Sequence, residues 1–220
     1  PHRMRDAPFA RGPGGRVTRI VLASASPRRR ELLRALLPEF DVATSDAREE
    51  FAESPIDDAE RLAEAKAAAL AGRFRGALVI GSDTIVFDGD RAYGKPEDAA
   101  DAARILRELR DREHGVVTGV AMMENGVCHA AHCVSAVTMA PLPDSAVEAY
   151  IASGRPMDKA GAYAIQDDDV PTVARLDGCY CNVMGLPLWT LRRMLRARGI
   201  DALDPGATYA RCSTCPDRSP

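Results

Sequence analysis

A run that leads directly from a predicted strand into a predicted helix, at residues 20–33, constrains the fold of this chain most. Its letters are IVLASASPRRRELL. The apolar start predicts a buried strand, and the alanines and serines that follow are small enough for a tight turn of the backbone. Ser26 suits the N-cap of a helix. Pro27 suits the first helical position, because the N–H that proline lacks would have no partner there.

The turn at Ser26 also has the chemistry of an anion site. Backbone N–H groups and the positive end of the helix dipole point at one spot in front of a helix N-terminus. Arg28 and Arg29 add guanidinium groups, whose paired donors match phosphate oxygens. The stretch therefore predicts phosphate binding. A capped helix with a solvated basic turn is the alternative.

Length, charge and cysteine usage exclude several classes of protein. The 220 residues suit one domain or two packed lobes. They carry 29 Lys and Arg against 32 Asp and Glu, which gives no electrostatic case for a nucleic-acid polymer or an anionic membrane as main partner. No apolar run approaches the roughly 20 residues of a membrane helix. The six unevenly spaced cysteines do not resemble a secreted disulfide framework, so the cytoplasm is the expected compartment.

The two ends of the chain differ in composition from the rest. Residues 1–16 are rich in Pro, Gly and Arg and lack the apolar core of a secretory signal, so we expect a flexible leader over residues 1–17 and a domain over 18–200. Residues 201–220 form a cysteine-containing tail. Its Cys212-x2-Cys215 pair has zinc spacing, which Cys179 and Cys181 would complete to four thiolates. Because a strong zinc signal needs two such pairs, reduced thiols on a loose tail or a disulfide are favoured.

Residues 77–87, ALVIGSDTIVF, place a charge between two apolar runs. A carboxylate within an otherwise buried strand costs free energy unless it is paired or holds a metal. Burial and charge together are how acid–base groups are made, so Asp83 is a candidate catalytic residue. Gly81 indicates that something approaches the backbone closely. The alternative is an Asp that marks a bulge or turn between two strands.

Residues 154–166, GRPMDKAGAYAIQ, gather charges around small residues. Small residues let a ligand or a neighbouring backbone come near. Gln166 offers both donors and an acceptor, as reading the edge of a base requires. A turn with surface charges is the alternative interpretation.

The remaining elements follow from apolar periodicity, caps and breakers. We predict helices at residues 31–37, 55–72, 98–109, 144–151 and 187–198, and strands at 40–44, 115–123, 128–139 and 173–176. Lys66 lies on the second of these helices, and Lys95 lies on extended backbone before Pro96. The acidic stretch 45–53, which includes Glu49, reads as a solvated loop when taken alone.

Taken together, these motifs resemble the Maf family of nucleotide pyrophosphatases. The likeness rests on SASPRRRELL, IGSDTIV with GKP about a dozen residues on, SGRPMDKAGAYAIQ and NVMGLPL, and it runs from about residue 20 to 195. It implies an α/β fold with an elongated mixed β-sheet flanked by helices, and two lobes with a cleft between them. Members of the family are often homodimers, so a homodimer is an implied partner.

Within the family, the chain is similar to the branch that hydrolyses dTTP and UTP. In that branch, arginine follows the Ser-Pro, threonine follows the aspartate and glutamine closes the AYxIQ motif. Here these residues are Arg28, Thr84 and Gln166. The resemblance implies that these three select the base and that Asp83 accepts the proton. It also implies roles around the phosphates and the metal for Ser24, Arg29, Glu49, Lys66 and Lys95.

The implied reaction cleaves a nucleoside triphosphate between its α- and β-phosphates. Such a reaction needs charge neutralisation, an in-line water and a metal. Mg²⁺, or alternatively Mn²⁺, would be held by the carboxylates of Asp83 and Glu49. Residues 167–175 depart from the glycine-rich segment typical of the family, which leaves another modified or purine nucleotide open as substrate. A nucleotide-binding regulator of septum formation with little turnover is the rival from another class.

Overall fold

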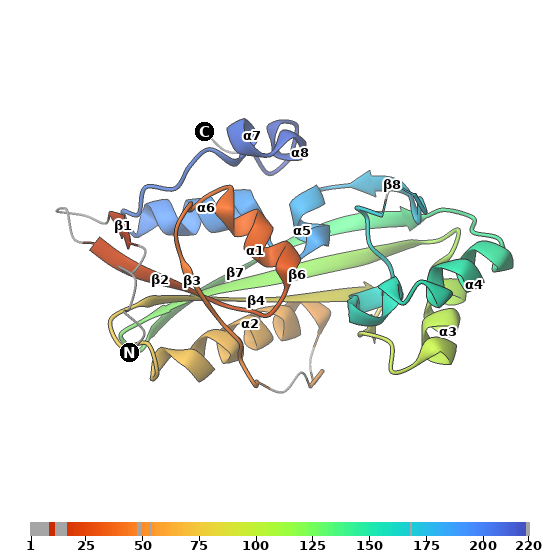
Figure 1. Ribbon diagram of the computed structural model, residues 1–220, viewed down its shortest axis with the longest axis horizontal. Helices are drawn as coiled ribbons and strands as arrows, with labels where there is room; N and C mark the ends of the chain where they lie inside the picture. Colours follow the sequence, from red (N-terminus) through yellow and green to blue (C-terminus); the bar gives the residue numbers. More distant parts are fainter. Residues whose placement is uncertain (1–8, 12–16, 48–49, 53, 168, 219–220) are drawn as a thin grey trace, which may run out of the picture.

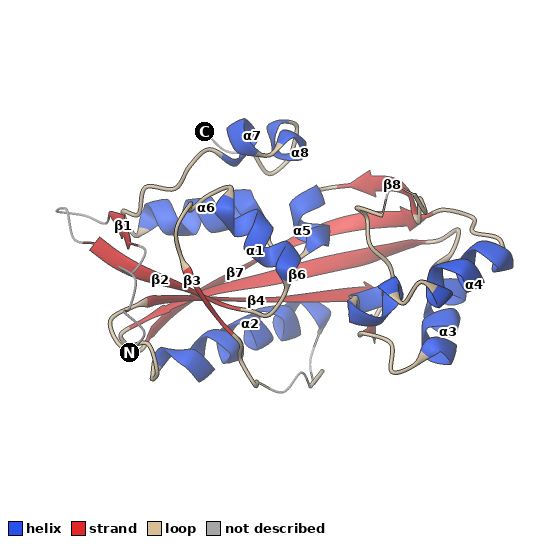
Figure 2. Cartoon of the chain, viewed as in Figure 1, coloured by secondary structure: helices blue, strands red, loops and turns tan. Residues whose placement is uncertain are grey.

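A single mixed sheet of eight strands organises the molecule, with helices on both faces (Figures 1 and 2). The computed structural model describes all residues except 1–8, 12–16, 48–49, 53, 168 and 219–220. Six strands follow one another as β1-β2-β4-β6-β7-β8, while β3 pairs with β2 and β5 with β4. The strands are β1 (Phe9–Arg11), β2 (Val17–Ala23), β3 (Asp41–Ala43), β4 (Leu78–Asp88), β5 (Arg91–Tyr93), β6 (Glu113–Glu124), β7 (Val127–Met139) and β8 (Val173–Asp177).

The helices begin largely where the capping residues of the sequence predict. Ser26 accepts a hydrogen bond from the N–H of Arg29, and Ser54 from that of Asp57, each with proline in the first turn. The α-helices are α1 (Pro27–Arg34), α2 (Pro55–Ala71), α3 (Ala99–Leu109), α4 (Asp144–Ala152), α5 (Tyr180–Met184), α6 (Leu188–Ala197), α7 (Pro205–Thr208) and α8 (Ala210–Ser213). Two 3-10 turns, η2 (Arg155–Asp158) and η3 (Ala160–Ala162), follow α4.

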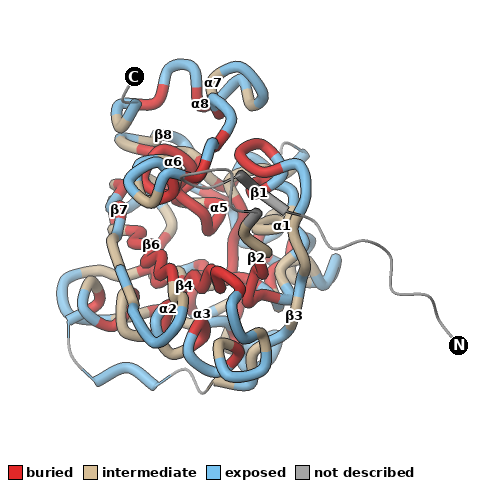
Figure 3. Tube along the Cα trace, turned by 90° about the vertical axis from the view of Figure 1, so that its left-hand side faces the viewer, coloured by how far each residue is buried: buried red, intermediate tan, exposed pale blue. Residues whose placement is uncertain are grey.

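The elements fall into two lobes along one elongated sheet. In one lobe α1, α5 and α6 cover one face of the sheet and α2 covers the opposite face, while α3 and α4 lie at the far end of the long β6–β7 hairpin (Figure 1). Separate apolar clusters fill the two ends, one around Trp189 and one around Tyr150. The buried residues accordingly follow the inner side of each layer (Figure 3). The predicted elongated α/β fold with two lobes is confirmed.

One edge of β4 changes partner part-way along the strand. On this edge β2 runs parallel to β4 as far as Leu22, opposite Ile80, and β5 joins antiparallel only at Val86. Between these points no strand of the described residues lies beside β4 on that edge, because the chain turns away after β2 toward α1. The gap opens next to Asp83, near the carboxyl end of β2, where open α/β sheets bind their ligands.

Helix α2 lies unusually close to the sheet because two glycines face it. A Cβ atom added to Gly81 would come 2.1 Å from the carbonyl oxygen of Ala63, and one added to Gly119 would come 2.1 Å from that of Ala59. The close approach that Gly81 predicts is therefore made by the backbone of a helix. Since side chains alternate along a strand, Gly81 and Asp83 share the face that α2 covers.

Three predictions about individual segments need correction. β4 is one continuous strand through Asp83, which stands opposite Gly119 on β6, so the alternative of a turn between two strands is wrong. Helix α1 begins at Pro27, as the Ser26 cap predicts, but it ends at Arg34 rather than at residue 37. Within the expected leader, Phe9–Arg11 pair with β2 as strand β1.

The cysteine-containing tail is not loose. Residues 205–208 and 210–213 form α7 and α8, and Cys212 and Cys215 are buried. The indole N–H of Trp189 on α6 donates a hydrogen bond to the carbonyl of Cys212 at 3.0 Å. Tertiary packing thus fixes a segment whose composition reads as disordered. In the described part of the chain, no helix is long and apolar enough to cross a membrane.

Candidate active site

A cavity of about 410 Å³ opens at the gap beside β4. It is bounded by the loop before α1, by α2 and β4, by the η2–η3 segment and by the end of α5. All eight predicted site residues in the described part of the chain line it: Ser24, Arg28, Arg29, Lys66, Asp83, Thr84, Lys95 and Gln166. Glu49, the ninth, lies outside the described residues.

A buried ion pair between Lys66 and Asp83 forms the floor of the cavity. The ammonium group of Lys66 on α2 donates to Oδ1 of Asp83 on β4. Both side chains are about one-tenth exposed, at 10% and 8%. The pair forms because Gly81 and Gly119 let α2 come against the strands. A charge pair this deep is costly to break, since removal of one partner leaves the other unpaired in a medium of low dielectric.

Arg29 is directed inward by a chain of hydroxyl groups. Its Nη2 donates to Thr84 Oγ1 at 3.0 Å, and Thr118 Oγ1 lies 3.0 Å from that same oxygen. Thr118 donates to the carbonyl of Asn182 at 2.8 Å, so the proton between the two threonines belongs to Thr84. The Thr84 hydroxyl proton therefore points away from the cavity, and this side chain presents an acceptor to a ligand.

The carbonyl group of Gly185 also holds the Arg29 side chain in place. It accepts from Nε of Arg29 at 2.8 Å and from the Ser82 hydroxyl at 3.0 Å. Gly185 ends α5 in the left-handed conformation, with φ of 108°, and an added Cβ would lie 3.2 Å from Thr84 Oγ1. Only glycine fits there without strain. The prediction did not include Gly185 among the site residues, although NVMGLPL marks its position in the sequence.

The loop between β2 and α1 closes on itself at the cavity mouth. The backbone N–H of Ser26 donates to Ser24 Oγ at 3.2 Å, and the Ser26 side chain caps the helix. Ser24 is 6% exposed, whereas Ala25 beside it is exposed. The predicted strand, small-residue loop and helix start are thus confirmed as local structure, and they place the N-terminus of α1 at the cavity.

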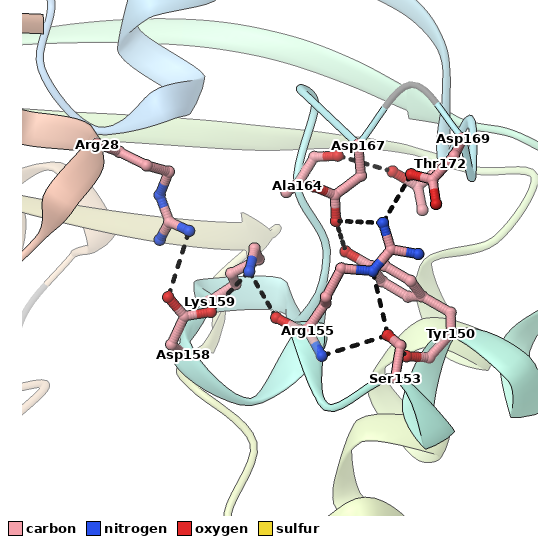
Figure 4. Close-up of polar contacts among 10 residues, drawn as sticks. All are labelled: Arg28, Tyr150, Ser153, Arg155, Asp158, Lys159, Ala164, Asp167, Asp169 and Thr172. Atoms are coloured by element: carbon pink, nitrogen blue, oxygen red, sulfur yellow. Dashed lines mark hydrogen bonds and ion pairs between the residues drawn. The ribbon is translucent and has the colours of Figure 1, made fainter. Parts of the chain in front are cut away.

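Across the cavity, Arg28 meets a carboxylate from η2. Nη1 of Arg28 lies 3.4 Å from Oδ2 of Asp158, and the ammonium of Lys159 lies 2.6 Å from Oδ1 (Figure 4). Burial raises the pKa of Asp158, but the hydrogen bond from Lys159 and the charge of Arg28 outweigh it and hold the pKa below its usual value. Lys159, 9% exposed, is a cavity cation that the prediction left out of the site.

Charged side chains also hold the segment around Gln166 in place. Arg155 lies 2.6 Å from Asp169 and 3.9 Å from Asp167, and the Tyr150 hydroxyl donates to Asp167 at 2.6 Å (Figure 4). The Arg155 guanidinium also stacks over the Tyr150 ring at 5.1 Å. Ion pairs thus hold the segment that follows Gln166.

A buried histidine contacts a tyrosine of the cavity lining. Nε2 of His114 lies 2.7 Å from the hydroxyl of Tyr163, whose side chain lines the cavity. Burial lowers the pKa of His114 to about 4, so the ring is neutral at physiological pH. The phenol and the imidazole meet edge to face, with ring centroids 5.4 Å apart.

Comparison with known proteins identifies the family of this chain. A family model described as "Maf-like protein" matches residues 19–198. The chain belongs to the Maf-like family. A curated relative from Geobacter sulfurreducens, named "dTTP/UTP pyrophosphatase", is 49% identical to this Maf-like chain over 82% of it and 97% of the relative. Relatives with the same name from Geobacter metallireducens and Pelotomaculum thermopropionicum are 48% and 44% identical, over 83% and 84% of this chain and 97% and 98% of their own lengths.

A structural comparison finds a fainter likeness. The HAM1 protein from Coxiella burnetii covers 82% of this chain and 99% of its own, with 17% identity and a TM-score of 0.45. The family assignment does not depend on it.

Groups that suit a metal ion occur in two places in this Maf-like chain. In the cavity, the carboxylate of Asp83 and the hydroxyl of Ser24 are hard oxygen donors of the kind that Mg²⁺ takes. Elsewhere, Cys133, Cys179 and Asp217 bring three potential ligand atoms within 4.8 Å of one another. The second group lies outside the set of residues that line the cavity.

Proposed function

We propose that this protein is a nucleoside triphosphate pyrophosphatase that hydrolyses dTTP and UTP to the monophosphate and pyrophosphate, with the catalytic domain in residues 18–200. The observation that carries the proposal is the buried Lys66–Asp83 pair at the floor of a cavity that Arg28, Lys95 and Lys159 also line. A buried acid surrounded by cations suits attack of water on a polyanion. The family and the names of the relatives support the same reaction.

Asp83 is the proposed acceptor for the proton of the attacking water. Lys66 contacts Oδ1, so Oδ2 is the oxygen that we assign to the water. The pairing fixes the carboxylate before substrate arrives, and a positioned base contributes about 10²–10⁴-fold in rate. Proton transfer to Asp83 as the water oxygen bonds to phosphorus would leave the pyrophosphate to depart with its charge balanced by the cavity cations.

The triphosphate would lie along the N-terminus of α1 and across to Lys95. Arg28 and Lys159 both contact Asp158, so a phosphate would compete with this carboxylate for their N–H groups. Nε of Arg29 donates to the Gly185 carbonyl and Nη2 donates to Thr84 Oγ1. We therefore propose that Arg29 also positions these two residues.

The oxygen donors beside Asp83 fit a hard divalent cation. We propose that Asp83, together with Glu49, holds Mg²⁺, with Mn²⁺ as the alternative. When bound, such an ion supplies charge neutralisation to the phosphate oxygens. The buried carboxylate of Asp58 accepts from the backbone N–H of Ala52, and so fixes this residue of the acidic stretch to the first turn of α2.

Base selection is proposed for Thr84, Gln166 and Arg28. Thr84 presents an acceptor, as its hydrogen bonds require, and the N3–H of uracil or thymine is a donor. Gln166 adds an amide that can donate to a base carbonyl. We place the reaction in the cytoplasm, with a nucleoside triphosphate as the partner and a homodimer as the assembly.

The test is release of pyrophosphate from a panel of triphosphates with Mg²⁺ or Mn²⁺. We expect turnover of dTTP and UTP to exceed that of dCTP, CTP and the purine nucleotides by at least about tenfold. The Asp83→Asn variant serves as the inactive control. Tight binding without release would instead support a nucleotide-binding regulator, and a modified or purine nucleotide as best substrate would overturn the pyrimidine assignment.

A further inference from the structure

Five of the six cysteines converge on one place away from the active-site cavity. Cys133 comes from β7, Cys179 and Cys181 from the start of α5, and Cys212 and Cys215 from the tail. All five are buried, at 1–7% exposed, and none forms a disulfide in the described structure. Buried cysteines commonly act as small apolar residues, but five of them from three separate segments form a dense cluster of soft donor atoms.

Cys179 lies at the centre of this cluster. Its thiol interacts with those of Cys133, Cys181 and Cys215. The Cys133 thiol donates to a carboxylate oxygen of Asp217 at 3.0 Å, and the ligand atoms of Cys133, Cys179 and Asp217 all lie within 4.8 Å of one another. Two thiols and a carboxylate thus lie close enough to share one ion, and the Cys215 thiol interacts with the central one of them. Thiolates and a carboxylate are donors that zinc takes with tetrahedral geometry.

The two remaining thiols lie to one side. Sγ of Cys181 is 3.1 Å from Sγ of Cys212, well beyond the roughly 2.05 Å of a disulfide bond. Cys212 begins the Cys-x2-Cys motif of the tail, and Cys215 ends it. Within that motif, Cys215 is the residue whose thiol interacts with the central thiol of Cys179.

We propose that Cys133, Cys179, Cys215 and Asp217 form a structural binding site for one Zn²⁺ ion, which fastens the tail to β7 and α5. Binding converts three thiols to thiolates, and the three protons pass to solvent. The carboxylate is the fourth ligand, so the ion and its four ligands together carry a net charge of 2−. Arg193 supplies a nearby cation, because its Nη1 donates to the backbone carbonyl of Asp217 at 3.1 Å.

The site is connected to the wall of the cavity through α5. Cys179 is the N-cap of that helix, and its backbone N–H donates to Ser135 Oγ on β7 at 3.0 Å. Six residues later α5 ends at Gly185, whose carbonyl orients Arg29. An ion at Cys179 would therefore stabilise both the tail and the position of this carbonyl.

Metal content of the full chain tests the proposal directly. The reduced protein is incubated with ZnCl2, freed of unbound metal and measured by elemental analysis. We expect about one zinc per chain, and less than about a tenth in Cys133→Ser and Cys215→Ser. Cys128→Ser is the matched control, because Cys128 packs in a different apolar cluster on β7, and it should keep its zinc.

Two readouts on the wild-type protein keep the proposal testable if a variant fails to fold. Co²⁺ in place of zinc should give thiolate-to-cobalt charge-transfer absorption, and a strong chelator should lower Tm by about 4–8 °C, as expected for loss of a bound ion. Absence of stoichiometric zinc from the reduced wild type, an iron-containing group at the thiols, or loss of zinc in Cys212→Ser but not in Cys133→Ser would each overturn it.

Discussion

The two walls of the cavity are held by opposite means. The wall of α2 and β4 contains a buried ion pair whose partners are 10% and 8% exposed, set in place by close helix–strand packing. The wall formed by residues 155–167 and Asp169 is held by ion pairs in which Asp158 and Asp169 are 63% and 72% exposed. The proposed chemistry lies on the first wall, and Gln166, one of the three residues proposed to select the base, lies on the second.

The two walls are expected to differ in rigidity. Breaking a buried pair by removing one partner costs about 3–5 kcal/mol, whereas an exposed pair contributes about 0–1 kcal/mol and is screened by salt. The first wall, here called the catalytic wall, is thus fixed by the core, and we expect the second, here called the recognition wall, to adjust to its ligand. Substitutions on the two walls should separate turnover and stability from selectivity.

The largest effect is expected at the fixed wall, in Asp83→Asn. The amide keeps the shape of the side chain but cannot accept a proton, so kcat should fall by at least about a hundredfold. Steady-state release of pyrophosphate from dTTP measures this change, with the exposed Asp90→Asn as control. Turnover near that of the wild type would remove Asp83 from the role of base.

Gly81→Ala tests whether backbone packing fixes that wall. The new Cβ would meet the Ala63 carbonyl oxygen at 2.1 Å, so α2 must move and Lys66 must move with it. We expect a loss of about 1–3 kcal/mol in the free energy of unfolding, measured by denaturant titration. Gly72→Ala is the matched control, because its Cβ would have nothing within 4 Å. Equal stability of the two variants would contradict this account of the wall.

Acid should loosen the recognition wall through His114. Burial lowers the pKa of this ring from 6.5 to about 4 in the folded state. The unfolded chain therefore binds a proton first, and the stability present above pH 6.5 is lost as the pH falls toward 4. The loss between pH 7 and pH 5 is expected to be roughly 2 kcal/mol. The change should be smaller in His114→Gln, and an unchanged slope of stability against pH in that variant would show that another group is responsible.

Gln166→Glu should change selectivity more than turnover. The carboxylate loses the amide donors, so the preference for uracil and thymine should fall by about tenfold. The ratio of kcat/KM for UTP to that for CTP measures the change, and a matched substitution at the exposed Glu97, to Gln, is the control. An unchanged ratio would exclude Gln166 from base recognition.

The smallest effect is expected in Arg155→Gln. This change removes the ion pairs to Asp167 and Asp169 but leaves Tyr150 in place. Since such exposed pairs contribute about 0–1 kcal/mol, KM should rise by no more than about threefold, and wild-type KM should move toward the variant's value in high salt. A large fall in kcat at low salt would mean that this wall takes part in the chemistry.

Local pattern was sufficient for much of the fold. The caps at Ser26 and Ser54, the apolar alternation of β6 and β7 and the helical period of α3 are set by neighbours along the chain, and each element formed where it was predicted. The motifs also selected residues that the structure brings into one cavity, from Ser24 to Gln166. Glu49 and the roles of the other eight stay predictions.

Long-range contacts decided what the sequence left open. The sequence by itself determined which residues carry charge, where helices and strands start, and that Asp83 belongs to a strand region, because these depend on short spacings. The tertiary structure alone decided that α2 presses on Gly81, that Gly185 orients Arg29 across 156 positions, and that the tail is buried with its cysteines together. Such contacts depend on the register and packing of whole elements, which no local pattern specifies.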